Sequence, residues 1–232
     1  MEKGLVVITG GTKGIGRALV EKFYKEGFAV VSCSRTQQDL DEMSQELGEG
    51  FYSMAADLSE KDEVENFAGF VKSLNRPVQV LIKNTGVFMP GKVTEEPAGA
   101  LEQQINTNLY SAYYLTRALM PEIEENTRSY IFNICSTASI VAYPNGGSYC
   151  ISKFALLGFT KVLREELKEK GIRVSAVLPG ATLTASWEGV ELPEDRFMPA
   201  EDVAEAIWMA YNMSGRTVME EILLRPQLGD II

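Results

Sequence analysis

Histidine is absent from the 232 residues of this chain. This absence excludes a Ser-His-Asp triad, a Cys-His dyad and every zinc site that needs a histidine ligand. Acid–base chemistry in this chain therefore has to run through tyrosine, lysine or carboxylate groups. We expect no metal site.

Cysteine is scarce as well, and Cys33, Cys135 and Cys150 show no CxxC spacing. Three cysteines cannot all pair, so buried, reduced thiols are the simplest account. The apolar run near the N-terminus is too short for the core of a signal peptide, and no stretch approaches the ~20 apolar residues of a membrane span. We therefore expect a cytoplasmic protein without a membrane partner.

Basic side chains are in deficit, with 22 Lys and Arg against 32 Asp and Glu and a net charge of −10. This balance argues against a nucleic-acid surface, which needs a basic patch. The hydrophobic fraction of 45% and the charged fraction of 23% are ordinary for a globular protein. Since no repeat or linker interrupts the chain, we predict one domain over residues 1–232.

Short β-branched runs alternate with longer amphipathic stretches along the chain. Alternation of this kind predicts parallel strands joined by right-handed crossovers, and strands that are apolar throughout indicate a sheet covered on both faces. We predict an α/β fold, a doubly wound parallel sheet of about seven strands with helices on both faces. The expected strands are 5–9, 29–33, 51–55, 80–83, 130–135, 174–178 and 222–224, and the expected helices lie near 15–26, 37–47, 60–74, 99–124, 148–169 and 201–212.

The least regular segment, 181–199, follows the sixth expected strand. It leaves the edge where open α/β sheets bind ligands, so it is a candidate cover for a substrate pocket. An ordinary surface loop is the alternative.

The string TGGTKGIG at 9–16 follows the first strand and opens the first helix. Glycines allow a tight turn and a close approach of the backbone to a pyrophosphate, which the free N–H groups of the helix N-terminus attract. A plain strand-to-helix turn needs far fewer glycines. The predicted dinucleotide contacts here are Gly10, Thr12, Lys13, Gly14, Ile15 and Gly16.

The second strand ends in Ser34-Arg35 and carries no acid there. A carboxylate at this position would hold a bare ribose 2′-hydroxyl, whereas Arg35 suits a 2′-phosphate and Lys13 adds a second positive charge. We therefore predict NADP(H) as the cofactor, with a solvated loop charge as the alternative for Arg35.

Polar turns follow the third and fourth strands. Asp57-Leu58 could accept a hydrogen bond from an adenine amino group, and Asn84-Thr85-Gly86 could pass beneath the cofactor. Each also fits ordinary turn chemistry.

Tyr149 and Lys153 lie four residues apart, so a helix presents both on one face. An ammonium favours the phenolate, so we expect Lys153 to lower the tyrosine pKa from about 10. Such a pair also arises by chance in surface helices. Ser136 ends the fifth strand, and Asn108 puts an amide inside a long helix that gives it no propensity reason to be there. Ketone reduction needs a proton donor about 3 Å from the developing alkoxide and a hydride source.

Taken in order, these motifs resemble the short-chain dehydrogenase/reductase family over essentially the whole chain. The resemblance implies a Rossmann-type fold and the following roles. Tyr149 would be the general acid and Ser136 would orient the substrate oxygen. Lys153 would lower the tyrosine pKa and bind the nicotinamide ribose, and Asn108 would hold a water of the proton relay. Pro179-Gly180 and Thr182 or Thr184 would border the nicotinamide.

Two features depart from the family pattern. Thr85 replaces the usual alanine and Lys83 a common asparagine, and the chain is short after Pro179-Gly180. The resemblance also implies a homodimer or homotetramer built on helices 99–124 and 148–169. The apolar stripe that could serve such an interface, or the core of the domain, is Leu156, Phe159, Val162 and Leu163.

The resulting hypothesis is an NADPH-dependent oxidoreductase that reduces a small ketone or other carbonyl, or oxidises a secondary alcohol, as carbonyl and 3-oxoacyl reductases do. Candidate substrates are ketones, diketones, pteridine-like carbonyls and acyl-thioester ketones. Two alternatives stay open: an NADP(H)-binding sensor or scaffold without turnover, and a doubly wound domain that binds FMN.

Overall fold

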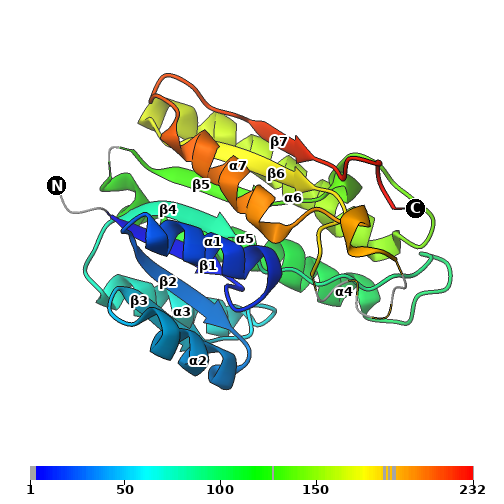
Figure 1. Ribbon diagram of the computed structural model, residues 1–232, viewed down its shortest axis with the longest axis horizontal. Coiled ribbons are helices and arrows are strands. Elements are labelled where there is room, and N and C mark those ends of the chain that lie inside the picture. The colour runs from blue at the N-terminus through cyan, green and yellow to red at the C-terminus, as the bar shows by residue number, and fades with distance from the viewer. Residues whose placement is uncertain (1–3, 127, 185–186, 188, 190–191, 232) are drawn as a thin grey trace.

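A computed structural model describes residues 4–126, 128–184, 187, 189 and 192–231. Seven parallel strands form one sheet in the order β3-β2-β1-β4-β5-β6-β7 (Figure 1). The predicted fold class is therefore confirmed. The strands are β1 (Leu5–Thr9), β2 (Ala29–Ser34), β3 (Phe51–Ala55), β4 (Val78–Lys83), β5 (Tyr130–Ile134), β6 (Arg173–Pro179) and β7 (Glu221–Leu224).

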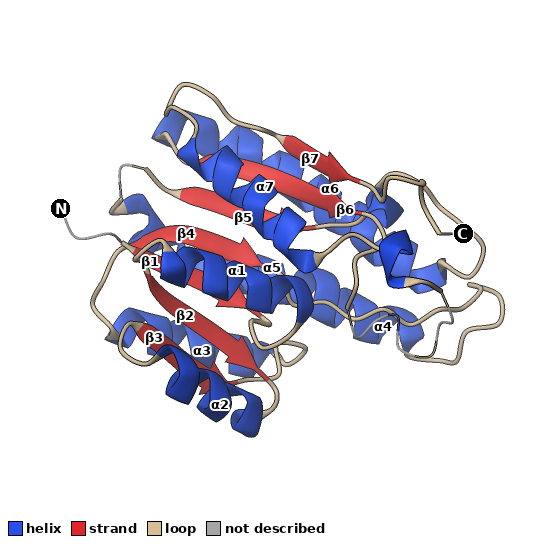
Figure 2. Ribbon diagram, viewed as in Figure 1, coloured by secondary structure: helices blue, strands red, loops and turns tan. Residues whose placement is uncertain are grey.

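Helices cover both faces of the sheet (Figure 2). Helices α1 and α7 pack on one face, and α3, α5 and α6 pack on the other. The α-helices are α1 (Gly14–Lys25), α2 (Gln37–Leu47), α3 (Lys61–Ser73), α4 (Ala100–Ile105), α5 (Ser111–Glu124), α6 (Gly147–Leu167) and α7 (Ala200–Asn212). Short 3-10 helices are η2 (Thr137–Ser139), η3 (Lys168–Lys170) and η5 (Glu194–Arg196).

Side chains of the strands β1 to β6 enter two hydrophobic clusters, one on each side of the sheet. In β1, Val6 and Ile8 pack with α1 and α7, whereas Leu5 and Val7 pack with α3 and α5. All four are fully buried. Since neither face meets water, the strand shows no polar alternation, which explains the continuous apolar runs in the sequence.

The strand order reverses beside β1, which pairs with β2 on one side and β4 on the other. In an open α/β sheet such a switch point leaves a crevice at the carboxyl ends of the strands, where ligands bind. The crevice here lies between the segments that follow Thr9 and Lys83.

The long helix predicted over 99–124 is interrupted. Between α4 and α5 lies a π-helical turn, η1 (Asn106–Tyr110), with Asn108 at its centre. Each π turn carries an extra residue and is common at functional sites. The Asn108 amide reaches out of the helix to the backbone of Val87, which explains the interruption.

Candidate active site

The glycine loop brings β1 into α1 by a turn that only glycine fits. Gly10 has a φ of 68°, and a Cβ added to Gly16 would lie 2.0 Å from the Gly10 carbonyl oxygen. Helix α1 has no side-chain cap at Lys13 and no acid in its first turn. Its first N–H groups and its positive dipole end therefore suit the pyrophosphate of a dinucleotide.

The turn after β4 is tied to this loop. Asn84 Nδ2 donates to the carbonyl oxygens of Thr9 at 3.0 Å and Gly10 at 3.1 Å. Thr9 Oγ1 in return accepts from the backbone N–H groups of Asn84 and Thr85, each at 3.0 Å. Asn84 therefore holds the glycine loop in place through hydrogen bonds to its backbone. The Thr85 hydroxyl lies beside Gly10, so the threonine is accommodated where the family usually has alanine.

Two basic residues lie at the neighbouring β2–α2 turn. Lys13 Nζ is 3.0 Å from Asp39 Oδ2, in the first turn of α2, and the lysine side chain is 70% exposed. Arg35 is exposed next to Ser34, whose Oγ donates to the Thr36 carbonyl. An exposed ion pair is weak, so Lys13 can exchange Asp39 for a stronger anion. The structure thus brings Lys13 to the turn that carries Arg35.

The Asp57 carboxylate takes part in turn chemistry. Its Oδ1 accepts hydrogen bonds from the N–H of Ser59 at 3.0 Å and from Ser59 Oγ at 2.8 Å. Leu58 is buried beneath this turn. Of the two interpretations of Asp57, the structural one is observed.

Ser136, Tyr149 and Lys153 are brought together at the carboxyl end of β5. Ser136 caps η2 and forms a side-chain hydrogen bond with Tyr149, while α6 presents Tyr149 and Lys153 on one face. Lys153 Nζ donates to the Ile134 carbonyl at 2.9 Å and lies 5.7 Å from the centre of the Tyr149 ring. Only 4% of Lys153 is exposed. A phenol, a hydroxyl and a buried ammonium therefore share one site.

The expected lowering of the tyrosine pKa is wrong for this structure. Burial raises the pKa of Tyr149 to about 12, and the hydrogen bond with Ser136 only partly opposes it. Burial also lowers the pKa of Lys153 to about 8. Loss of solvent disfavours both charged forms, and neither group is among the causes of the other's shift.

Asn108 is fully engaged with neighbouring protein groups. Its Oδ1 accepts from Val87 N–H at 2.7 Å, and its Nδ2 donates to the Val87 carbonyl at 3.0 Å and to Ser152 Oγ at 2.8 Å. A Cβ on Gly86 would lie 3.3 Å from Asn108 Oδ1 and 3.5 Å from Lys153 Nζ. The turn after β4 is therefore packed against both residues.

The segment after β6 crosses the glycine loop. Pro179 ends β6, Gly180 N–H donates to the Leu224 carbonyl at 2.8 Å, and Thr182 Oγ1 donates to the Gly180 carbonyl at 3.1 Å. Thr184 lies over Gly14, where an added Cβ would be 2.8 Å from Thr184 Cγ2. Residues 185–186, 188 and 190–191 of the predicted cover lie outside the described residues.

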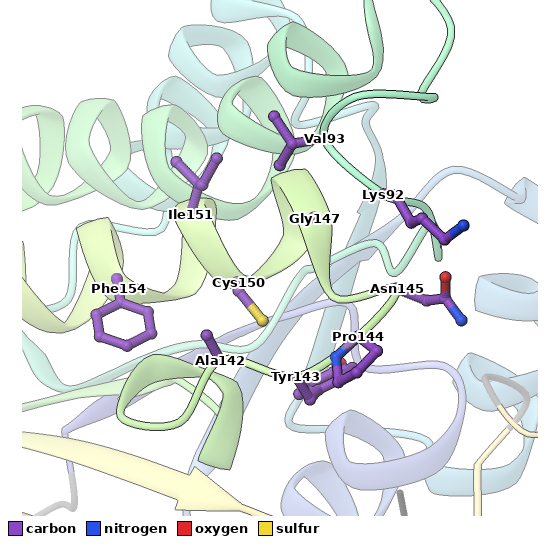
Figure 3. Close-up of a pocket in the computed structure, with 10 residues that line it drawn as sticks. All are labelled: Lys92, Val93, Ala142, Tyr143, Pro144, Asn145, Gly147, Cys150, Ile151 and Phe154. Carbon is purple, nitrogen blue, oxygen red and sulfur yellow. The ribbon is translucent and has the colours of Figure 1, made fainter.

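A cavity of about 570 Å³ opens beside the start of α6 (Figure 3). It lies next to Tyr149 in sequence but includes neither Tyr149 nor Ser136 in its lining. Tyr143 and Cys150 face it on one side, and Lys92 and Val93 enter from the segment before α4. The sequence offered no signal for this cavity, because its walls come from separate, irregular segments.

The sequence reasoning did not predict the structural roles of two further residues, Lys83 and Glu96. Lys83 points away from the crevice into the α5–α6 layer, where its Nζ donates to Thr116 Oγ1 and burial lowers its pKa to about 7. Glu96 accepts a 2.9 Å hydrogen bond from Ser148 N–H and another from Ser148 Oγ, so a carboxylate holds the start of the helix that carries Tyr149. The Glu96–Ser148 contact joins residues 52 positions apart in the chain and therefore has no local sequence pattern.

The family model for short chain dehydrogenases matches residues 4–195. The chain belongs to the short-chain dehydrogenase family. The resemblance inferred from the ordered motifs is thereby confirmed. The described residues contain no helix that is both long and apolar enough to span a membrane.

Relatives within this family match over nearly the full chain. A sepiapterin reductase of Chlorobaculum tepidum is 33% identical, over 99% of this chain and 98% of the relative. A metagenomic short-chain oxidoreductase, solved in complex with NADP, is 29% identical with a TM-score of 0.83, covering 97% of each chain. An alcohol dehydrogenase of Thermococcus sibiricus is 22% identical with a TM-score of 0.90 over 99% of each chain, and it supports the fold alone.

Proposed function

We propose that this chain is an NADP(H)-dependent oxidoreductase that reduces a carbonyl group, or oxidises the corresponding secondary alcohol, with Tyr149 as the general acid or base. The observation that carries the proposal is the grouping of Tyr149 with Ser136 and Lys153 beside a glycine loop that suits a pyrophosphate. NADPH, when bound, supplies the hydride.

The chain's own groups would divide the remaining work. With its pKa raised to about 12, the Tyr149 phenol stays protonated at neutral pH and can donate its proton to the substrate oxygen. Ser136 can donate to the same oxygen and orient it. Lys153, whose pKa of about 8 lies near neutrality, is placed to replace the tyrosine proton and to bind ribose hydroxyls. In this proposal Asn108 holds a water of the proton relay that runs from Lys153 toward solvent.

The preference for NADP(H) rests on Arg35, which is exposed in the β2–α2 turn, and on Lys13, whose Nζ pairs with Asp39 in the first turn of α2. A 2′-phosphate there would receive charge-assisted hydrogen bonds from a guanidinium and an ammonium. The NADP bound in the metagenomic relative supports the same assignment. Gly10, Thr12, Gly14, Ile15 and Gly16 would hold the pyrophosphate.

The other predicted contacts lie along the rest of the crevice. We propose Ser34, Asp57 and Leu58 for the adenine end, and Asn84, Thr85, Gly86, Pro179, Gly180, Thr182 and Thr184 for the ribose and nicotinamide end. The sepiapterin reductase name of the 33% identical relative makes pteridine-side-chain ketones one class to test, alongside simple ketones and diketones.

Tyr149→Phe tests the proposal directly. It removes one hydroxyl and should lower the rate of NADPH oxidation with a carbonyl panel by about 100- to 10,000-fold, while the NADPH dissociation constant stays unchanged. Stopped-flow fluorescence measures both quantities. Full activity in the variant would overturn the mechanism, and tight NADPH binding by the wild type without turnover on any carbonyl would favour the sensor or scaffold alternative.

We propose further that residues 1–232 act as one cytoplasmic domain that assembles as a homodimer or homotetramer. Buried free thiols at Cys33, Cys135 and Cys150 support a reducing compartment. Leu156 and Leu163 serve the core, but Phe154 and Val162 of α6 are 46% and 55% exposed and could face a partner. Sedimentation velocity would give the mass of the assembly.

A further inference from the structure

Two amide side chains on neighbouring turns of α4 and η1 pair with the strand-like segment after β4. Asn108 bonds Val87 through both its amide groups, and Gln104 Oε1, four residues earlier, accepts from Met89 N–H at 3.2 Å. Both side chains are buried, at 1% and 0% exposure. Together they hold the backbone at 87 and 89 and leave Phe88 between the two anchored residues.

Phe88 projects to the active site. Its ring lies edge-to-face against Tyr149 with the centroids 4.8 Å apart, and 37% of Phe88 is still exposed. The ring therefore touches the proposed acid on one side and offers a free aromatic surface on the other. Exposed Ile140 and Val141, which follow the Ser136 segment, add apolar surface at the same edge of the sheet.

The stability of the fold does not explain why a glutamine occupies position 104. Its Nε2 is buried and has no hydrogen-bond partner among the described residues. A buried donor without a partner is costly, and a leucine of similar size would remove that cost together with the one bond to Met89. The contact that distinguishes Gln104 from a core leucine is its hydrogen bond to the Met89 N–H, which fixes the backbone of residues 87–89.

We propose that Gln104 is a positioning residue that holds Phe88 against Tyr149, and that the Phe88 ring makes the site prefer carbonyl substrates that carry a flat, conjugated group. This inference rests on the proposed carbonyl reduction. A flat group can lie on or against the Phe88 ring while its carbonyl oxygen meets Tyr149 and Ser136. A puckered aliphatic ring of the same size can touch the Phe88 ring but cannot form an aromatic pair with it.

The first test needs no turnover. Tyrosine is ring-labelled, the Tyr149 signal is assigned with Tyr149→Phe, and spectra are recorded for Gln104→Leu, Phe88→Leu and the control Gln103→Leu. Gln103 is exposed on the same helix. We expect the first two variants to move the Tyr149 signal and the control to leave it in place, because ring currents depend on the Phe88 position. An unmoved signal in Gln104→Leu would overturn the positioning role.

The second test compares acetophenone with cyclohexyl methyl ketone, which share a carbon skeleton but differ in ring shape. The wild-type ratio of the two kcat/KM values includes the intrinsic difference in reactivity of the two ketones, so the change between variants carries the test. Gln104→Leu and Phe88→Leu should lower the ratio of acetophenone to cyclohexyl methyl ketone by about three- to tenfold, the range of one aromatic contact, with unchanged NADPH affinity, whereas Gln103→Leu keeps it. A ratio that both variants retain would overturn the substrate preference. If the wild type binds NADPH but reduces no carbonyl, the proposed function fails instead, and the NMR comparison still decides the role of Gln104.

Discussion

The two halves of the active-site edge are built from different parts of the chain. At the glycine loop the functional groups are backbone N–H groups and exposed charges, held by Gly10, Gly16 and the amide of Asn84. At the Tyr149 end they are side chains of the buried Lys153 and the partly buried Tyr149, whose pKa values are moved by loss of solvent. The first half depends on close backbone packing, and the second depends on what surrounds each titratable group.

Because the glycine loop depends on close backbone packing, an added side chain there should impair NADPH binding more than any other change. Gly16→Ala would bring Cβ to 2.0 Å from the Gly10 carbonyl oxygen. We expect NADPH affinity to fall by roughly 30- to 100-fold, which corresponds to about 2–3 kcal/mol of overpacking. Fluorescence titration with NADPH measures the loss.

Gly69→Ala in α3 is the matched control, since nothing lies within 4 Å of the added Cβ. It should leave NADPH binding unchanged and stabilise the helix by about 0.5–1 kcal/mol. Equal NADPH affinity in Gly16→Ala and the wild type would show that the loop tolerates the added atom and would remove the distinction between the two halves.

Charge reversal at Arg35, on the side of the glycine loop, should have the next largest effect on cofactor binding. Arg35→Asp removes the guanidinium proposed for the 2′-phosphate and supplies a carboxylate that suits a ribose hydroxyl. The ratio of NADPH to NADH affinity should fall by about 10- to 100-fold, the worth of one charged hydrogen bond. Arg216→Asp, at another exposed arginine, should keep the ratio. If both variants behave alike, Arg35 is a solvated charge.

The smallest effect on cofactor binding is expected from Lys83, which tests burial through stability without touching the crevice. The folded protein holds its pKa at about 7, below the ordinary 10.5. Between these values the unfolded chain binds more protons, so the free energy of unfolding rises with pH. This lysine contributes at most about 1.4 kcal/mol per pH unit. The destabilisation is complete below pH 7 and is relieved as the pH rises toward the pKa of free lysine, 10.5.

Lys83→Met should therefore be more stable than the wild type near neutrality, with an advantage that shrinks as the pH rises. Urea unfolding at a series of pH values measures this difference. Lys25→Met, at an exposed lysine of α1, should give a curve parallel to that of the wild type. A parallel curve for Lys83→Met as well would mean that Lys83 is not desolvated.

Local patterns predicted the fold and the positions of the site groups. The apolar strands, the glycine string and the Tyr149/Lys153 spacing each report a property of adjacent residues, and the structure assembles them at one sheet edge. The direction of the Tyr149 pKa could not be predicted, because it depends on burial by segments far away in sequence. The π turn at Asn108 and the Gln104 contact with Met89 escaped for the same reason.

Lys83 illustrates what the sequence could predict about a residue and what it could not. The sequence marked it as a departure from the family pattern at the end of β4, but no local pattern indicated where its side chain points. The structure turns it into the helical layer, where Thr116 and the Phe159 ring receive it. Which face of a strand a residue takes follows from the register, and near the end of a strand the sequence pattern does not define it.

The central claim is that Tyr149 is a partly buried acid that stays protonated at working pH. An NMR titration of ring-labelled tyrosine, with Tyr149→Phe to assign the signal, measures its pKa directly. The account predicts a pKa near 12, and a still higher one in Ser136→Ala, since the hydrogen bond from Ser136 opposes the effect of burial. A pKa for Tyr149 below the ~10 of free tyrosine would contradict it.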